Sequence, residues 1–365
     1  MSRLAAELGA VNLGQGFPDE DGPEVVREAA IEAIRSGRGN QYPPAHGVPE
    51  LRQEIARHQE HFYELTPDWR EEVVVTTGAA EAIVASVLAF VDRDDEVLMF
   101  DPFFDMYPAV TALAGGAAVP VPMSPGFRPD LSALAAAITD RSRVLLLNSP
   151  HNPTGTVFTA DELEGMAALA VKHDLIVISD EAYEHLTYPP ARHIPIATLP
   201  GMWERTVTIG SGGKSFSFTG WKVGWASGPA DLIAAVRVVR QHLSYVSGGP
   251  FQWALVEGFR HGEVIFDDLR RSMWLQRDLL CRGLSDIGIP PIVPDGTYFA
   301  ITDVRPLGFD SGAQFCDMIP DRVGVVAIPL SALSEHPERS GPYVRWAFSK
   351  RPETIQDGLA RLSDL

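Results

Sequence analysis

Cysteine is scarce in this chain of 365 residues, which contains only Cys281 and Cys316. Both lie in apolar segments, and no CxxC spacing occurs, so the sequence indicates neither a disulfide framework nor a zinc site. We expect two buried thiols and no bound metal.

Basic residues are also too few to balance the acidic ones. Thirty lysines and arginines stand against 48 aspartates and glutamates, which gives a formal net charge of −18 at pH 7. This sign of charge repels nucleic-acid phosphates and anionic membrane surfaces alike. We therefore expect neither nucleic acid nor a membrane as a partner.

Long apolar runs are missing as well. The opening residues MSRLAAELGAVNLG lack the apolar stretch of a signal peptide, and no later run approaches the roughly 20 apolar residues of a membrane span. The simplest expectation is a cytoplasmic protein. Its length predicts two domains, or one large domain with a smaller lobe.

What the sequence does contain is an alternation of short apolar runs and helical patterns between about residues 47 and 245. Helical patterns cover residues 79–91 and 160–174, and the runs that we expect to be strands are VVVTT (73–77), EVLMF (96–100), RVLLLN (143–148), LIVIS (175–179), TVTIG (206–210) and KVGWAS (222–227). Continuous apolar strands separated by helices indicate an α/β domain of three layers around a mostly parallel sheet.

The pattern changes beyond residue 250. A helical stretch over about 250–285 precedes three strand-like pieces and a terminal helix, and the strand-like pieces are TYFAITDV (297–304), VGVVAIP (323–329) and YVRWAFS (343–349). This order predicts a smaller α+β domain. We expect residues 1–40 to contribute to the small domain, 41–245 to form the large domain and 246–365 to complete the small one.

Ligands of doubly wound sheets bind where strands end and helices begin. Five such junctions carry polar residues: TTGAAEA (76–82), FDPFFDMY (100–107), LNSPHNPTG (147–155), ISDEAYEH (178–185) and GSGGKSF (210–216). The last one is not a nucleotide-binding P-loop, because Thr208 occupies the position of that motif's first glycine. It leaves Lys214 in a small-residue turn, either as a solvated amine or as one able to form a Schiff base.

The other junctions also permit two interpretations. TTGAAEA is a plain strand-to-helix turn or a set of free amides for an anion. Asp180 is an N-cap of the following segment or a buried carboxylate that holds a proton on a heterocycle nitrogen. Asn148 and Asn152 belong to an ordinary Asn-Pro turn, or one of them aims an amide at a ligand oxygen. Arg345, within the apolar strand VRWAFS, needs a carboxylate from the protein or from a substrate.

Taken together, these motifs resemble a known family. The chain resembles the class I pyridoxal-phosphate aminotransferases of fold type I in the five junctions and in GQGFPD (14–19), NQYPPAHGVPELR (40–52), GTYF (296–299), VAIPLSAL (326–333) and VRWAFSK (344–350). The resemblance runs from about residue 10 to the C-terminus and is nearest to the kynurenine/glutamine and bacterial N-succinyldiaminopimelate aminotransferases. It implies an aspartate aminotransferase-like fold, pyridoxal 5'-phosphate bound by the large domain, and a ping-pong transfer of an amino group between an L-amino acid and a 2-oxo acid.

The resemblance also assigns roles to residues. Three are catalytic: Lys214 forms the Schiff base, Asp180 pairs with the pyridine nitrogen, and Tyr183 donates to the phenolic oxygen together with Asn152. The other expected cofactor contacts are Gly78, Ala79, Ala80, Ser211 and Lys222 at the phosphate and Phe104 on the ring face. The expected substrate contacts are Arg345 on the α-carboxylate, assisted by Gly16 and Asn152. Tyr42 reaches the phosphate of the other subunit, which implies a homodimer.

The substrate is less closely defined. Our first expectation is N-succinyl-L,L-diaminopimelate with 2-oxoglutarate, a step of lysine biosynthesis, and a basic pocket beyond Arg345, for which Arg128 and His46 are candidates, would favour it. The alternatives are a kynurenine, glutamine or methionine aminotransferase, with or without cysteine-conjugate β-lyase activity. A lyase or decarboxylase of the same fold, and a non-catalytic binding protein on this scaffold, are more distant possibilities. Lys222 replaces an arginine of many relatives, and Ala80 replaces a larger residue of the kynurenine type, which weakens that alternative.

Overall fold

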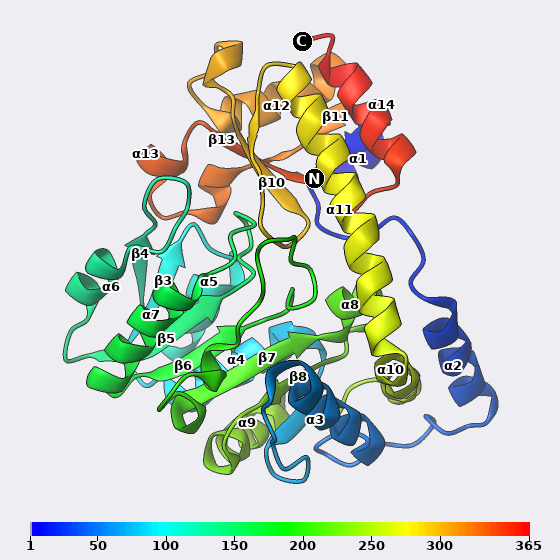
Figure 1. The fold of residues 1–365 in the computed structure, drawn as a ribbon, viewed down its shortest axis with the longest axis vertical. Helices are drawn as coiled ribbons and strands as arrows, with labels where there is room; N and C mark the ends of the chain where they lie inside the picture. The colour runs from blue at the N-terminus through cyan, green and yellow to red at the C-terminus, as the bar shows by residue number, and fades with distance from the viewer. Residues whose placement is uncertain (1) are drawn as a thin grey trace.

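The strands of the protein form three sheets in the computed structural model, which describes residues 2–365 (Figure 1). The largest has seven strands, in the spatial order β2 (Val73–Thr76), β8 (Gly224–Ser227), β7 (Thr206–Ser211), β6 (Ile176–Asp180), β5 (Ser142–Asn148), β3 (Glu96–Asp101) and β4 (Ala117–Pro122). The four pairings from β7 to β4 are parallel, whereas β8 runs antiparallel to both of its neighbours. The expectation of a mostly parallel sheet is confirmed.

The edge strand β4 was not predicted from the sequence. It contains Pro120 and Pro122, which a central strand does not tolerate because proline has no amide hydrogen for the sheet. At the edge, with one neighbour only, these prolines are compatible with pairing to β3. The low strand propensity of its sequence therefore reflects its position.

Helices cover both faces of the seven-stranded sheet, which makes the three layers. The apolar side chains of β3 alternate between the faces: Val97 and Met99 pack on one side, and Leu98 and Phe100 on the other. The first side is covered by α4 (Gly78–Phe90), α5 (Met106–Ala114) and α9 (Ala230–Leu243). The second is covered by α6 (Leu131–Ala137) and by α7 (Ala160–Lys172), whose start is fixed by a capping box.

A further group of helices packs beside β2 and β8. It comprises α2 (Glu24–Arg35), α3 (Pro49–Tyr63), α10 (Gly249–Arg260) and the long α11 (Gly262–Asp286), which rises past the sheet toward the C-terminal part (Figure 1). The sequence predicted one helical stretch over 250–285, but the structure has two helices. They are separated at His261, whose φ of −104° and ψ of 9° leave the helical region.

The smaller sheets lie in the C-terminal part of the chain. One has the order β12 (Ile328–Pro329), β13 (Tyr343–Ala347), β10 (Phe299–Asp303) and β9 (Pro291–Ile292), and the other pairs β1 (Val11–Asn12) in parallel with β11 (Val325–Val326). The remaining helices are α1 (Ser2–Leu8), α8 (Gly212–Ser215), α12 (Gly312–Val323), α13 (Pro337–Ser340) and α14 (Pro352–Leu362). The N-terminal strand thus belongs to this part of the fold, while the domain boundaries near residues 40 and 245 stay predictions.

The register of the large sheet brings polar residues to one edge. Asn148 pairs with Asp180 on the neighbouring strand, and Ser211 pairs with Gly224. These are the carboxyl ends of β5, β6 and β7, where ligands bind in such sheets. In residues 2–365, no helix is both long and apolar enough to cross a membrane.

Close packing at Gly224 gives the first prediction. A Cβ atom at this position would lie 2.5 Å from the Ala79 nitrogen and 2.6 Å from the Gly78 carbonyl carbon, so the backbone would have to move. We expect Gly224→Ala to destabilise the fold by about 1–3 kcal/mol, as overpacking does. Thermal unfolding should show a lower Tm, while the control Gly220→Ala, where nothing lies within 4 Å, should match the wild type. Equal Tm values for both variants would contradict this account of β8 and α4.

Candidate functional site

A pocket of about 260 Å³ lies at the carboxyl edge of the large sheet, near the lower end of the usual range for ligand sites. It is lined by every predicted site residue except Tyr42, namely Gly16, Gly78, Ala79, Ala80, Phe104, Asn152, Asp180, Tyr183, Ser211, Lys214, Lys222 and Arg345. These residues come from the N-terminal segment, from all five junctions of the sheet, from the turn before β8 and from β13. The structure brings them together, and their individual roles stay predictions.

One end of the pocket has the chemistry of an anion site. The helix α4 begins at Gly78, and its first amides, including those of Ala79 and Ala80, have no partner within the helix. Gly78 has a φ of +73°, and a Cβ atom there would lie 3.4 Å from Lys222 Nζ, so the lysine amine lies over the helix start. Ser211 is next to them at the end of β7, and its hydroxyl does not cap α8.

The charges of the pocket lining are unbalanced. Lys214, Lys222 and Arg345 line it with a single carboxylate, that of Asp180. Within residues 2–365, no carboxylate lies within the 4 Å ion-pair distance of any of the three cations. A chain with a net charge of −18 thus keeps an excess of positive charge at this one place. Such a lining suits anionic groups, such as phosphates and carboxylates.

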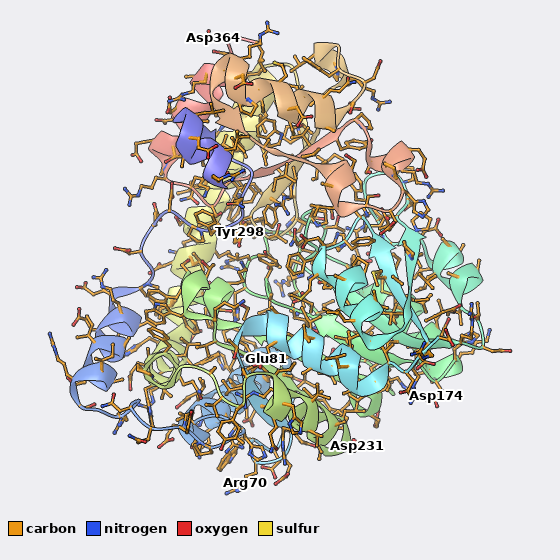
Figure 2. The ribbon with its side chains drawn as sticks, turned by 180° about the vertical axis from the view of Figure 1, so that it is seen from behind. Arg70, Glu81, Asp174, Asp231, Tyr298 and Asp364 are labelled. Atoms are coloured by element: carbon orange, nitrogen blue, oxygen red, sulfur yellow. The ribbon has the colours of Figure 1, made fainter. Side chains whose placement is uncertain are left out.

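Lys214 is held by a short chain of hydrogen bonds. Its Nζ atom donates to the Tyr298 hydroxyl at 2.8 Å, and that hydroxyl donates to the Gly16 carbonyl at 2.6 Å. Burial raises the pKa of Tyr298 to about 12, so the phenol stays protonated. Figure 2 shows Tyr298 where the C-terminal strands meet the large sheet. We did not predict Tyr298 as a site residue, although the GTYF motif that contains it could have indicated it.

Asp180 is buried at the end of β6, and both of its oxygens are occupied. Tyr107 donates its hydroxyl to Oδ2 at 2.7 Å, and the Ala182 amide donates to Oδ1 at 3.2 Å. Burial raises the pKa of Asp180 to about 6, against the opposing effects of these hydrogen bonds and of Lys214. Tyr107 is a second site residue that the sequence did not single out. Its position in the first turn of α5 depends on the fold.

Asn148 joins the Asp180 strand to the Asn152 turn. Its Nδ2 group donates to the Asp180 carbonyl at 2.8 Å, and its Oδ1 atom accepts the Asn152 amide at 2.7 Å. The sequence offered Asn148 and Asn152 as candidates for an amide aimed at a ligand. In the structure the Asn148 side chain bonds to the backbone on both sides and so positions the Asn152 turn.

Arg345 has hydrogen bonds but no counterion from the protein. Its Nη1 atom donates to Asn152 Oδ1 at 2.9 Å, its Nη2 atom donates to the Gly14 carbonyl at 3.1 Å, and the guanidinium lies 4.1 Å from the centre of the Phe299 ring. Its Nε atom has no hydrogen-bond partner among the described residues. Burial lowers the pKa of Arg345 to about 10. No carboxylate of residues 2–365 pairs with it, and a carboxylate from the substrate stays the prediction.

Three other candidates lie outside the pocket. Tyr42 is 80% exposed, with its ring 5.5 Å from that of Tyr245. Arg128 is bonded to Glu162, and neither it nor His46 lines the pocket. Within one chain, neither Arg128 nor His46 therefore supplies a basic group for a second substrate carboxylate.

We expect Asp180→Asn to remove a pH dependence from the stability of the cofactor-free protein. Raising the carboxyl pKa from 3.8 to about 6 on folding corresponds to about 3 kcal/mol, at 1.36 kcal/mol for each pKa unit. Because the folded state holds the proton more tightly, this cost is absent below pH 3.8, grows as the pH rises and is complete above about 6. Urea unfolding between pH 4 and 7.5 should show the wild type losing stability relative to the variant. A difference that stays constant over this range would contradict the burial argument.

The chain is similar to known aminotransferases in sequence and in structure. A sequence model described as "Aminotransferase class I and II" matches residues 9–362. The chain is 48% identical to a probable N-succinyldiaminopimelate aminotransferase of Mycobacterium tuberculosis, over 100% of this chain and 94% of the relative. The solved structure of that enzyme from the same species matches with a TM-score of 0.98 and covers 100% of this chain and 95% of its own. Kynurenine–oxoglutarate transaminase 3 of Mus musculus is 38% identical, over 97% of this chain and 84% of the relative, and a methionine aminotransferase of Escherichia coli is 36% identical, over 100% and 94%.

Proposed function

Because the chain belongs to the class I and II aminotransferases, which use pyridoxal phosphate, we propose that its amino donor is N-succinyl-L,L-diaminopimelate and its acceptor 2-oxoglutarate. The observation that carries this substrate is the 48% identity, over the whole chain, to a relative with that name. The kynurenine transaminase is 38% identical to this chain and the methionine aminotransferase 36%, which is ten and twelve percentage points less. The proposed reaction is a step of lysine biosynthesis in the cytoplasm.

The pocket offers separate places for the two ends of the cofactor. The amides of Ala79 and Ala80, the Ser211 hydroxyl and the Lys222 amine would hold its phosphate. Asp180 would pair with its ring nitrogen, Asn152 and Tyr183 with its phenolic oxygen, and the Phe104 side chain would cover the ring. When bound, pyridoxal phosphate supplies an electron sink for the negative charge that develops at the substrate α-carbon.

The side chains of the chain itself do the remaining work. Arg345 binds the substrate α-carboxylate through guanidinium N–H groups that have no partner in the described chain, such as that of Nε. It thereby orients the α-carbon toward Lys214. Lys214 Nζ then accepts the α-proton as the general base. In the cofactor-free protein the Tyr298 hydroxyl holds this amine in the pocket, because it accepts a hydrogen bond from Nζ while it donates its own to Gly16.

The proposal includes a homodimer. Tyr42 is exposed and lies outside the pocket of its own chain, so it is free to reach the phosphate of a second copy. A partner subunit would also add residues to the substrate side of the pocket, where Arg128 and His46 are missing. In this arrangement each site is complete only in the dimer.

A kynurenine or methionine aminotransferase is the second candidate function. The relatives with those names match 97% and 100% of this chain. The small Ala80 beside the phosphate site disfavours the kynurenine type. Cysteine-conjugate β-lyase activity belongs with this alternative.

The covalent role of Lys214 can be measured without activity. We expect borohydride reduction of the pyridoxal-phosphate-loaded protein to fix the cofactor on the peptide that contains Lys214, as peptide mass spectrometry would show. Lys214→Arg should carry no label. Lys222→Arg should still carry it, because an arginine keeps the charge at the phosphate site. A label on the Lys222 peptide would show that the two lysines have the opposite roles.

The substrate is tested by initial rates with 2-oxoglutarate and a panel of amino donors. We expect kcat/KM for N-succinyl-L,L-diaminopimelate to exceed the values for kynurenine, glutamine and methionine by at least about tenfold, or about 1.4 kcal/mol. A larger value for one of the other donors would replace the proposed substrate. Product formed from a cysteine conjugate without any acceptor would reveal β-lyase activity.

A further inference from the structure

Two histidines and a glutamate form a compact cluster outside the pocket. His58 comes from α3, whereas Glu184 and His185 follow β6. The Nε2 atoms of the histidines are 2.8 Å apart, and Glu184 Oε2 lies 3.6 Å from that of His58 and 3.9 Å from that of His185. The side chains of His58, Glu184 and His185 are only 4, 6 and 7% exposed.

These separations fit one divalent metal ion. The circle through the three atoms has a radius of about 2.0 Å, which is the length of a zinc bond to histidine nitrogen or carboxylate oxygen. Ligand atoms of a tetrahedral site with such bonds lie about 3.3 Å apart, and the three observed sides bracket that value. Two imidazoles and one carboxylate also form a known zinc ligand set, which leaves a fourth position for water.

The carboxylate of this cluster has no cation beside it. Glu184 Oε2 accepts the Tyr63 hydroxyl at 2.8 Å, but no lysine or arginine in the described part of the chain lies within 4 Å of Glu184. A buried carboxylate without a positive partner is costly. A divalent ion shared with the two imidazoles would supply the missing charge.

Aromatic rings enclose the cluster and leave one side near the surface. The His185 ring is stacked on Phe266 at 3.7 Å. Phe62 lies 5.0 Å from the His58 ring and 5.1 Å from the His185 ring, and it is 38% exposed. An apolar shell of this kind limits the access of water to a metal site, and Phe62 is the member of this shell that reaches the surface.

We propose that His58, Glu184 and His185 form a binding site for Zn²⁺ or a similar divalent transition metal. The metal would tie α3 to the segment that carries Asp180 and Tyr183, and so would stabilise the floor of the pocket without lining it. This departs from the expectation of no bound metal, which rested on the cysteine spacing. His58 and His185 are 127 residues apart, so no local motif reveals the site.

The test uses the full-length enzyme loaded with pyridoxal phosphate, stripped of metal by a chelator and then dialysed against Zn²⁺. Elemental analysis after gel filtration should find one zinc per chain, and Zn²⁺ should raise the Tm by a few degrees because it binds the folded state. The variants His58→Gln and Glu184→Gln should lose the zinc and the Tm rise. The control His242→Gln removes an exposed histidine elsewhere and should behave as the wild type.

If a variant fails to fold, metal binding by the wild type alone tests the proposal. Substitution with Co²⁺ should then produce visible absorption bands of a nitrogen-coordinated metal in the wild type. Zinc retained at less than a tenth of one equivalent, an unchanged Tm, or equal binding by wild type and Glu184→Gln would overturn the proposal. The cluster would in that case be a hydrogen-bonded network without a metal.

Discussion

The buried guanidinium of Arg345 is the constraint on which the arrangement of the site depends. It lies on β13 and donates to Asn152, which follows β5, and to the Gly14 carbonyl of the N-terminal segment. Three parts of the chain that are far apart in sequence therefore meet at one side chain. Because these partners are neutral, the charge remains uncompensated within the described chain, and the site is prepared for an anion before one arrives. The same holds for Lys222 over the start of α4.

Asp180 combines a structural contact with a buried carboxyl group that has no cation bonded to it among the described residues. Its bond to the Ala182 amide is the turn-capping contact that an ordinary aspartate makes at a strand end. Its other oxygen accepts only a phenol, that of Tyr107, and burial keeps the pKa of the carboxyl high. A cationic ring nitrogen would supply the compensation that the protein withholds. The expected helix N-cap is instead the cap of a turn over residues 182–185, and the pairing with a ring nitrogen stays a prediction.

Much of the site could be predicted because its residues follow strands, and the carboxyl ends of neighbouring parallel strands meet at one edge. Lys214, Asp180 and Asn152 belong to such junctions, and Arg345 is conspicuous as a charge within an apolar strand. Tyr107 and Tyr298 were missed because aromatic residues in apolar surroundings look like core, and only the fold shows which hydroxyl finds a polar partner. The break between α10 and α11 at His261 was missed because both sides carry one continuous helical pattern.

The antiparallel strand β8 fixes how the two lysines of the pocket are placed relative to each other. The chain departs from the sheet after Ser211, passes Lys214, and returns through Lys222 to pair Gly224 with Ser211. The two lysine amines of the pocket thus lie on one connection between β7 and β8, which is closed at its base by the pairing of Ser211 with Gly224. A shift of the β7–β8 pairing would therefore move both amines together, so the distance between them depends on how firmly these two strands are paired.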